Sequence, residues 1–156
     1  MSDESQTGTK EDGKSTMGGD AEVRQVAGMT LAGRSGSNHW VIMDGKKNFG
    51  GAEGGASPME LVLLALGGCT SMDVISLLRK MRIQYSDFRV TMDVERAEEH
   101  PKVFTDIILH YHFTGKELPP AKLEKAVSLS QDKYCSVSAM LNKAVNISYQ
   151  IHTYDE

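Results

Sequence analysis

The stretch that decides the fold is LALGGCTSMDVIS, residues 64–76, in which two glycines and a cysteine interrupt a strong helix pattern. A glycine inside a helix costs about 1 kcal/mol relative to alanine, so Gly67 and Gly68 indicate that another part of the structure approaches this backbone closely. Cys69 lies where that approach is expected, and the residues after it change from apolar to polar. These features together predict a thiol at a packed but accessible junction.

The same stretch lies in a long helix predicted over residues 58–81. Ser57 offers a side-chain oxygen for the N-cap, Pro58 suits the first helical position, and Glu60 completes a capping box. The helix is apolar on nearly every side over residues 59–66 apart from Glu60. A helix that is apolar all round is buried all round, and a small single domain rarely has room for one.

Length, composition and charge narrow the function classes. The 156 residues are 40% hydrophobic, which fits one domain of ordinary size, expected over residues 21–156. Seventeen basic and twenty-one acidic residues leave a net charge of −4, so neither a nucleic acid nor an anionic membrane is an expected partner. We identify no secretory signal and no run of about eighteen apolar residues, so a cytoplasmic location is expected. In that reducing compartment the two cysteines would pair transiently.

The first 20 residues are polar and Gly-rich, and we expect them to form a flexible leader. Residues 8–15 match the phosphate-binding loop G-x-x-x-x-G-K-[ST] formally. No strand pattern precedes them, and two glycines stand where the helix should begin, so we interpret the match as coincidence.

The rest of the chain predicts an α+β domain with mostly antiparallel strands, because strands are grouped between blocks of helix. Alternating apolar residues predict the strands, and prolines or capping residues predict the helix starts. The expected elements are a hairpin at 21–33 and 38–44, a second hairpin at 87–97 and 103–113, a helix at 121–134 opened by Pro119-Pro120, a short helix at 137–144 capped by Ser136, and a closing strand at 145–154.

The two thiols are the main candidates for chemistry. A nucleophilic cysteine reacts as a thiolate, which is a minor species for a free cysteine at neutral pH. Asp73, one turn after Cys69, would oppose ionisation there, so a working site needs a cation, for which Arg24 and Arg34 are the candidates. Cys135 precedes a helix N-terminus, and on dipole grounds alone it would be the more acidic thiol. The alternative for Cys69 is an inert buried cysteine.

Metal binding has weaker support in the sequence. His110 and His112 are two positions apart on a predicted strand and would point to the same face. No third ligand is evident, so a solvated strand face is the preferred interpretation and no metal site is expected.

The segments SPMELVLLALGGCTSMDVISLLRKM (57–81) and KAVSLSQDKYCSVSAML (125–141) resemble the two cysteine segments of the OsmC/Ohr family, osmotically inducible and organic hydroperoxide resistance proteins. The sequence of the first segment resembles the less characterised, YhfA-like branch of the family more than it resembles the Ohr enzymes. The resemblance implies an intertwined homodimer in which antiparallel sheets wrap around paired long central helices. Gly67 and Gly68 would then allow the partner's backbone to pack closely.

The resemblance also implies a reaction. Cys69 would attack an organic hydroperoxide and become a sulfenic acid, Cys135 would condense with it to a disulfide, and an external dithiol of the lipoyl type would reduce the pair, with no bound cofactor. Arg34 matches the family's arginine that steadies the thiolate. Met59 stands where the hydroperoxide reductases have a glutamate that orients this arginine, so Glu53 or Glu60 is expected to support Arg34 instead.

The sequence therefore leaves two functional hypotheses. One is a thiol-dependent peroxidase that reduces organic hydroperoxides. The other, motivated by Met59, is a non-catalytic redox sensor or a protein that binds small apolar ligands on the same scaffold.

Overall fold

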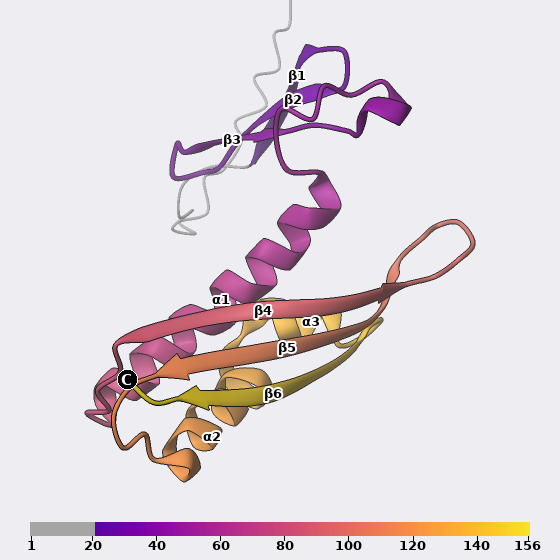
Figure 1. Cartoon of the computed structure of the whole chain (residues 1–156). Helices are drawn as coiled ribbons and strands as arrows, with labels where there is room; N and C mark the ends of the chain where they lie inside the picture. The colour runs from indigo at the N-terminus through magenta and orange to yellow at the C-terminus, as the bar shows by residue number, and fades with distance from the viewer. Residues whose placement is uncertain (1–20) are drawn as a thin grey trace, which may run out of the picture. The chain divides into compact units, whose positions relative to one another are not determined.

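The computed structural model describes residues 21–156 (Figure 1). The expected leader and the loop match at residues 8–15 lie outside the described residues. The described residues divide into two compact units, with the boundary between Pro58 and Met59: residues 21–58 and Met59–Glu156. Each unit is described separately below.

The first unit is a three-stranded antiparallel sheet. Its strands are β1 (Glu22–Ala27), β2 (Thr30–Arg34) and β3 (Trp40–Met43), in the order β1-β2-β3. The sequence pattern over 21–33 predicted one strand, and this is wrong, because the chain turns between β1 and β2. Gly28 makes that turn with φ of 55°, a conformation that costs glycine little, and the Gln25 side chain donates a hydrogen bond to its carbonyl at 2.7 Å.

Asp44 organises the glycine-rich loop that follows β3. This residue is 3% exposed, and its carboxylate accepts hydrogen bonds from the backbone N–H groups of Gly45 at 2.7 Å, Ala52 at 3.2 Å and Gly54 at 3.1 Å. The hydroxyl of Thr30 donates a further hydrogen bond at 3.0 Å. These donors, the Gly54 N–H first among them, lower the pKa of Asp44. A short 3-10 turn, η1 (Lys47–Phe49), lies inside the same loop.

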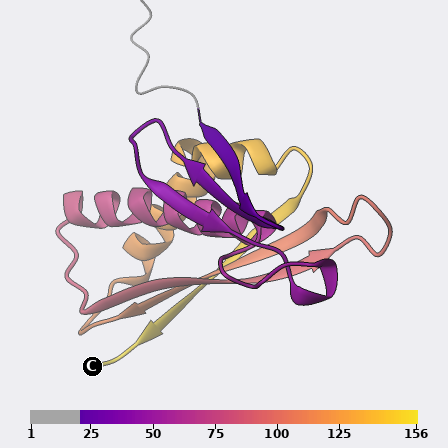
Figure 2. The same ribbon diagram turned by 90° about the horizontal axis from the view of Figure 1, so that it is seen from above.

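The second unit is a three-stranded sheet with helices on one face, as Figures 1 and 2 show. Helix α1 (Pro58–Lys80) confirms the long helix with its predicted start, and β4 (Asp87–Arg96) with β5 (Phe104–Thr114) confirms the second hairpin. The remaining elements are α2 (Pro120–Leu129), the π-helical turn η2 (Ser130–Tyr134), α3 (Ser136–Leu141) and β6 (Asn146–Tyr154). Strand β6 pairs parallel with β5, whereas the other three ladders are antiparallel, so the predicted α+β class with mostly antiparallel pairing is confirmed.

The core lies between the sheet and the helices. Alternate residues of β5 are fully buried, which follows from the period-2 apolar pattern of that strand. They pack against the buried face of α1 and against α2. The fully buried core residues include Leu66, Val74 and Leu78 of α1, Ile107, Leu109, Tyr111 and Phe113 of β5, and Leu123 of α2.

Helix α1 buries only one of its faces within the single chain. Leu64 is 60% exposed, Met72 75% and Ile75 41%, and Gly68 is also exposed on this side. By length and composition α1 is apolar enough to cross a membrane, although Thr70, Ser71 and Asp73 interrupt its apolar residues. The two glycines differ in their surroundings. A Cβ atom added to Gly67 would lie 3.0 Å from Cε of Met92. A Cβ atom added to Gly68 would have no atom of another part of the described structure within 4 Å.

Candidate functional site

The second unit brings the two cysteines together. A sulfur or oxygen atom from each of Cys69, Cys135 and Asp73 lies within 4.8 Å of the other two. Cys69 is half-buried on α1, whereas Cys135 is 2% exposed. Both thiols are free. A solute can therefore reach the Cys69 thiol, whereas the neighbouring Cys135 thiol is shielded from solvent.

The local structure explains how these three groups meet. Cys69 and Asp73 are four residues apart on α1, which places them on one side of the helix. Cys135 follows η2 in an extended conformation, and its sulfur accepts a hydrogen bond from the backbone N–H of Ser138 at 3.4 Å. Cys135 is thus the N-cap of α3, and the expectation that Ser136 caps this helix was wrong, because Ser136 is already its first helical residue.

Burial determines the acidity of Cys135. It raises the pKa of the Cys135 thiol, and the neighbouring Cys69 raises it further, while hydrogen bonds from Ser138 oppose the shift. Cys135 is therefore not the acidic thiol that the helix dipole alone predicted. Helix α3 has only 6 residues, so its N-terminus offers little to offset the loss of solvation.

A buried polar network joins α1 to η2 beside the thiols. The Thr70 hydroxyl shares hydrogen bonds with the Tyr111 hydroxyl at 2.6 Å and with the Ser130 hydroxyl at 2.9 Å. The Gln131 amide donates to Thr70 at 2.9 Å and to Tyr111 at 2.8 Å. Ser138 donates to the Gln131 carbonyl oxygen at 3.0 Å. Burial raises the pKa of Tyr111 to about 12, so this phenol is neutral at physiological pH.

The network also holds the acidic member of the site. The Ser130 hydroxyl lies 3.1 Å from a carboxylate oxygen of Asp73 and donates to it. Thr70, Ser130 and Gln131 were not among the site residues predicted from the sequence. Thr70 and Ser130 are polar residues on otherwise apolar helix faces, and this was the available signal. The π-helical turn, a feature frequent at functional sites, could not be read from the pattern.

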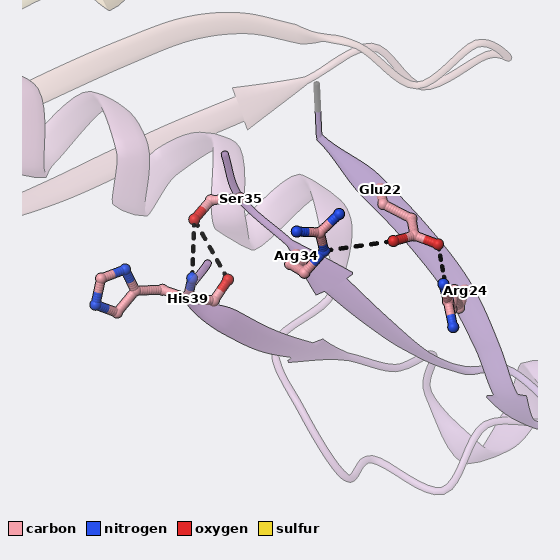
Figure 3. A network of polar contacts seen from close by, with 5 residues as sticks. All are labelled: Glu22, Arg24, Arg34, Ser35 and His39. Atoms are coloured by element: carbon pink, nitrogen blue, oxygen red, sulfur yellow. Dashed lines mark hydrogen bonds and ion pairs between the residues drawn. The ribbon is translucent and has the colours of Figure 1, made fainter. Parts of the chain in front are cut away.

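Arg34 lies in the first unit, at the end of β2, and Figure 3 shows its partner. Its Nε is 3.4 Å from a carboxylate oxygen of Glu22 on β1, and the Arg24 guanidinium pairs with the same carboxylate. The hydrogen bond from Arg24, with a smaller contribution from Arg34, lowers the pKa of Glu22. Glu22 was not among the residues predicted from the sequence to support Arg34.

The two carboxylates expected to support Arg34 are placed as follows. Glu53 lies 3.9 Å from the Lys47 ammonium group. Glu60 is exposed in the first turn of α1, and Met59 packs against the core of the second unit.

An open hollow of about 350 Å³ adjoins Arg34 on the first unit. Its lining is mostly apolar and includes Val23, Trp40, Val41 and Met43, together with Arg34 and Glu22. Such a surface suits a small organic molecule with one polar group.

Three histidines, His110 and His112 of β5 and His152 of β6, form a row of neighbouring rings on the face of the sheet that points away from the helices. His110 shares hydrogen bonds with His152 of β6 at 3.0 Å and with Asp93 at 3.1 Å. The rings of His112 and His152 stack with centroids 4.8 Å apart. Within the part of the chain that the structure describes, the one group of three potential metal ligands that gathers closely is Cys69, Asp73 and Cys135.

The chain is similar in sequence and in fold to known proteins. Residues 50–150 match the family described as OsmC-like protein. Protein YhfA of Escherichia coli (strain K12) is 46% identical over 135 residues, covering 86% of this chain and 96% of the relative. A hypothetical protein of Aquifex aeolicus VF5 with a crystal structure is 31% identical, with a TM-score of 0.76 over 88% of this chain and 96% of that chain. An organic hydroperoxide resistance protein OsmC from Legionella pneumophila has the same fold, with a TM-score of 0.67 at 17% identity over 89% and 99% of the two chains.

Proposed function

Because the chain belongs to the OsmC-like protein family, we propose that it is a thiol-dependent peroxidase that reduces organic hydroperoxides through Cys69 and Cys135. Membership in this family supports a peroxide-related redox role. The observation that carries the finer proposal is the pair of sulfur atoms within 4.8 Å, one half-exposed and one buried.

Exposure decides the role of each thiol. Cys69 is the half-exposed thiol, so its thiolate attacks the terminal oxygen of the hydroperoxide, the O–O bond breaks, and the alcohol leaves as Cys69 becomes a sulfenic acid. The Cys135 sulfur then attacks the sulfenic sulfur, forming the disulfide and releasing water. An external dithiol, for which a lipoyl group is the proposed type, reduces this disulfide by thiol–disulfide exchange and is itself oxidised. The protein needs no bound cofactor for this cycle.

Arg34 is the proposed cation for the Cys69 thiolate, by its match to the family's arginine. Its pairing with Glu22 supports a role for that carboxylate in orienting the guanidinium, which compensates for Met59. The apolar hollow beside Arg34 supports a preference for hydroperoxides with an organic body over hydrogen peroxide.

The proposed assembly is a homodimer. Both units leave large apolar side chains exposed in the single chain, among them Trp40 at 54% and Phe49 at 73% in the first unit and Met72 at 75% on α1. Exposed apolar area of this kind marks an interaction surface. We propose that α1 packs against a second copy rather than in lipid, since its other face covers the sheet and carries Thr70. A cytoplasmic location, without nucleic-acid or membrane partners, completes the proposal.

The test is turnover of cumene hydroperoxide and hydrogen peroxide by the purified full chain, with dihydrolipoamide or a monothiol as reductant. The expected result is turnover that favours the organic peroxide and the dithiol and that is lost in Cys69→Ser. Oxidation of both thiols without turnover would contradict the proposal and favour the alternative, a redox sensor or apolar ligand-binding protein, to which Met59 also points.

A further inference from the structure

Cys69, Asp73 and Cys135 form a set of donor atoms that the peroxidase reaction does not fully use. Two sulfurs and one carboxylate lie within 4.8 Å of one another, yet the proposed cycle needs the sulfurs alone. We propose that the reduced protein binds one thiophilic divalent cation, Zn²⁺, through these three side chains. The proposal concerns metal binding and does not depend on peroxidase turnover.

The spacing of the donors fits this cation. Zn–S bonds of about 2.3 Å in a tetrahedral site place two thiolates about 3.8 Å apart, within the 4.8 Å that contains the three donors here. Cys69 and Asp73 come from one face of α1, four residues apart, and Cys135 comes from the start of α3. Donors on helices are held more precisely than donors on loops.

Hydrogen bonds already orient two of the three donors. Ser130 donates to the Asp73 carboxylate at 3.1 Å, and the Ser138 N–H donates to the Cys135 sulfur at 3.4 Å. Partners of this kind fix the direction of metal ligands and are usual in metal sites. Ser130 is itself held by Thr70, so the polar network supports the whole set.

The donor types select the metal. Thiolates favour soft or borderline cations and disfavour Mg²⁺ and Ca²⁺, and the carboxylate is a ligand that Zn²⁺ accepts alongside sulfur. Three protein ligands would leave one tetrahedral position for water, and Cys69 and Asp73 are both half-exposed, so solvent reaches the site.

Metal binding and oxidation compete for the same two sulfurs. Binding of Zn²⁺ by the two thiols releases two protons. An organic hydroperoxide then oxidises the zinc dithiolate: one equivalent of ROOH and two protons yield the disulfide, free Zn²⁺, ROH and water. The site would therefore hold zinc when the thiols are reduced and release it when they are oxidised.

The experiment is anaerobic titration of the reduced, chelator-stripped full chain with Zn²⁺ against a chromophoric chelator, and with Co²⁺ as a spectroscopic substitute. One equivalent of Co²⁺ is expected to give a thiolate-to-cobalt charge-transfer band, which Zn²⁺ displaces. Cys69→Ser and Cys135→Ser should lose the band, and Asp73→Asn should weaken binding at least 10-fold. Protein oxidised to the disulfide should give no band.

Two matched variants separate this site from other binding. Asp132→Asn removes an exposed carboxylate of η2 and should leave binding unchanged. The double variant His110→Asn/His152→Asn removes the stacked histidine pair and should also leave the band unchanged. A band that survives in the disulfide form, or that depends on the histidines and not on the cysteines, would overturn the proposal. The cobalt band and the chelator competition report metal binding alone. A failure of metal binding can therefore be told apart from a failure of peroxidase turnover, which is measured in a separate assay.

Discussion

The sulfur of Cys135 accepts a hydrogen bond from the backbone N–H of Ser138 at 3.4 Å, so the proposed resolving thiol is also the N-cap of α3. The Cys135 side chain therefore has two roles, a proposed one in disulfide formation and one in stabilising the start of α3. A serine at this position still caps a helix, whereas an alanine does not. This difference allows the two roles to be measured separately.

Replacement of Cys135 should separate catalysis from capping. Cys135→Ser is expected to abolish disulfide formation, and the Cys69 sulfenic acid should accumulate and be trapped by dimedone in mass spectra. Cys135→Ala should show the same redox defect and lose in addition about 0.5–2 kcal/mol of unfolding free energy in urea, because the cap is gone. Equal stability of the two variants would show that a capping side chain at this position contributes little.

Thr70 is expected to matter through the buried network. Thr70→Val keeps the shape of the side chain but leaves the Tyr111 and Ser130 hydroxyls and the Gln131 amide short of a partner. We expect a loss of about 1–3 kcal/mol in chemical denaturation. Thr91→Val makes the same change on an exposed strand position and should stay within about 0.5 kcal/mol of the parent. A neutral Thr70→Val would mean that the network is not a stability element.

Asp44 should make stability depend on pH in the acidic range. Its pKa in the folded protein is below 3.8, so the contribution of the carboxylate is fully present above pH 3.8 and is lost as the pH falls through the folded value. Asp44→Asn is expected to lower the melting temperature at pH 7, and the difference from the parent should shrink below pH 3.8. Asp87→Asn, at an exposed position, provides the control. A difference that is constant with pH would exclude the ionised carboxylate as the cause.

The exposed face of α1 is expected to carry the dimer contact. Met72→Glu and Leu64→Glu place a charge on this apolar face and should shift sedimentation from dimer to monomer. Gln150→Glu, an exposed change on β6, should leave the dimer intact. If both α1 variants sediment as the parent does, the contact lies elsewhere.

Glu22 should support the activity through Arg34. Glu22→Gln weakens the ion pair that orients the guanidinium, and misplacement of such a group can cost up to about 100-fold in kcat/KM for cumene hydroperoxide. Glu53→Gln changes a carboxylate that faces Lys47 and should have a smaller effect. A larger loss of kcat/KM in Glu53→Gln than in Glu22→Gln would indicate that Glu53, as expected from the sequence, supports Arg34.

The sequence by itself determined the elements whose signals are local. Ser57, Pro58 and Glu60 predicted the start of α1, because capping depends on residues within one turn. The alternating pattern predicted the two strands of the β4–β5 hairpin, since side chains of a strand point to alternate sides. The two cysteine segments, through their resemblance to a family, also indicated the fold class.

Only the tertiary structure decided the surroundings of those residues. The burial that makes Cys135 less acidic, the network around Thr70 and the carboxylate beside Arg34 all depend on groups distant in sequence. The parallel pairing of β6 likewise depends on the crossover through α2 and α3. A local pattern reports which face of an element is apolar, but the solvation, charge and hydrogen bonding of a side chain depend on what packs against that face.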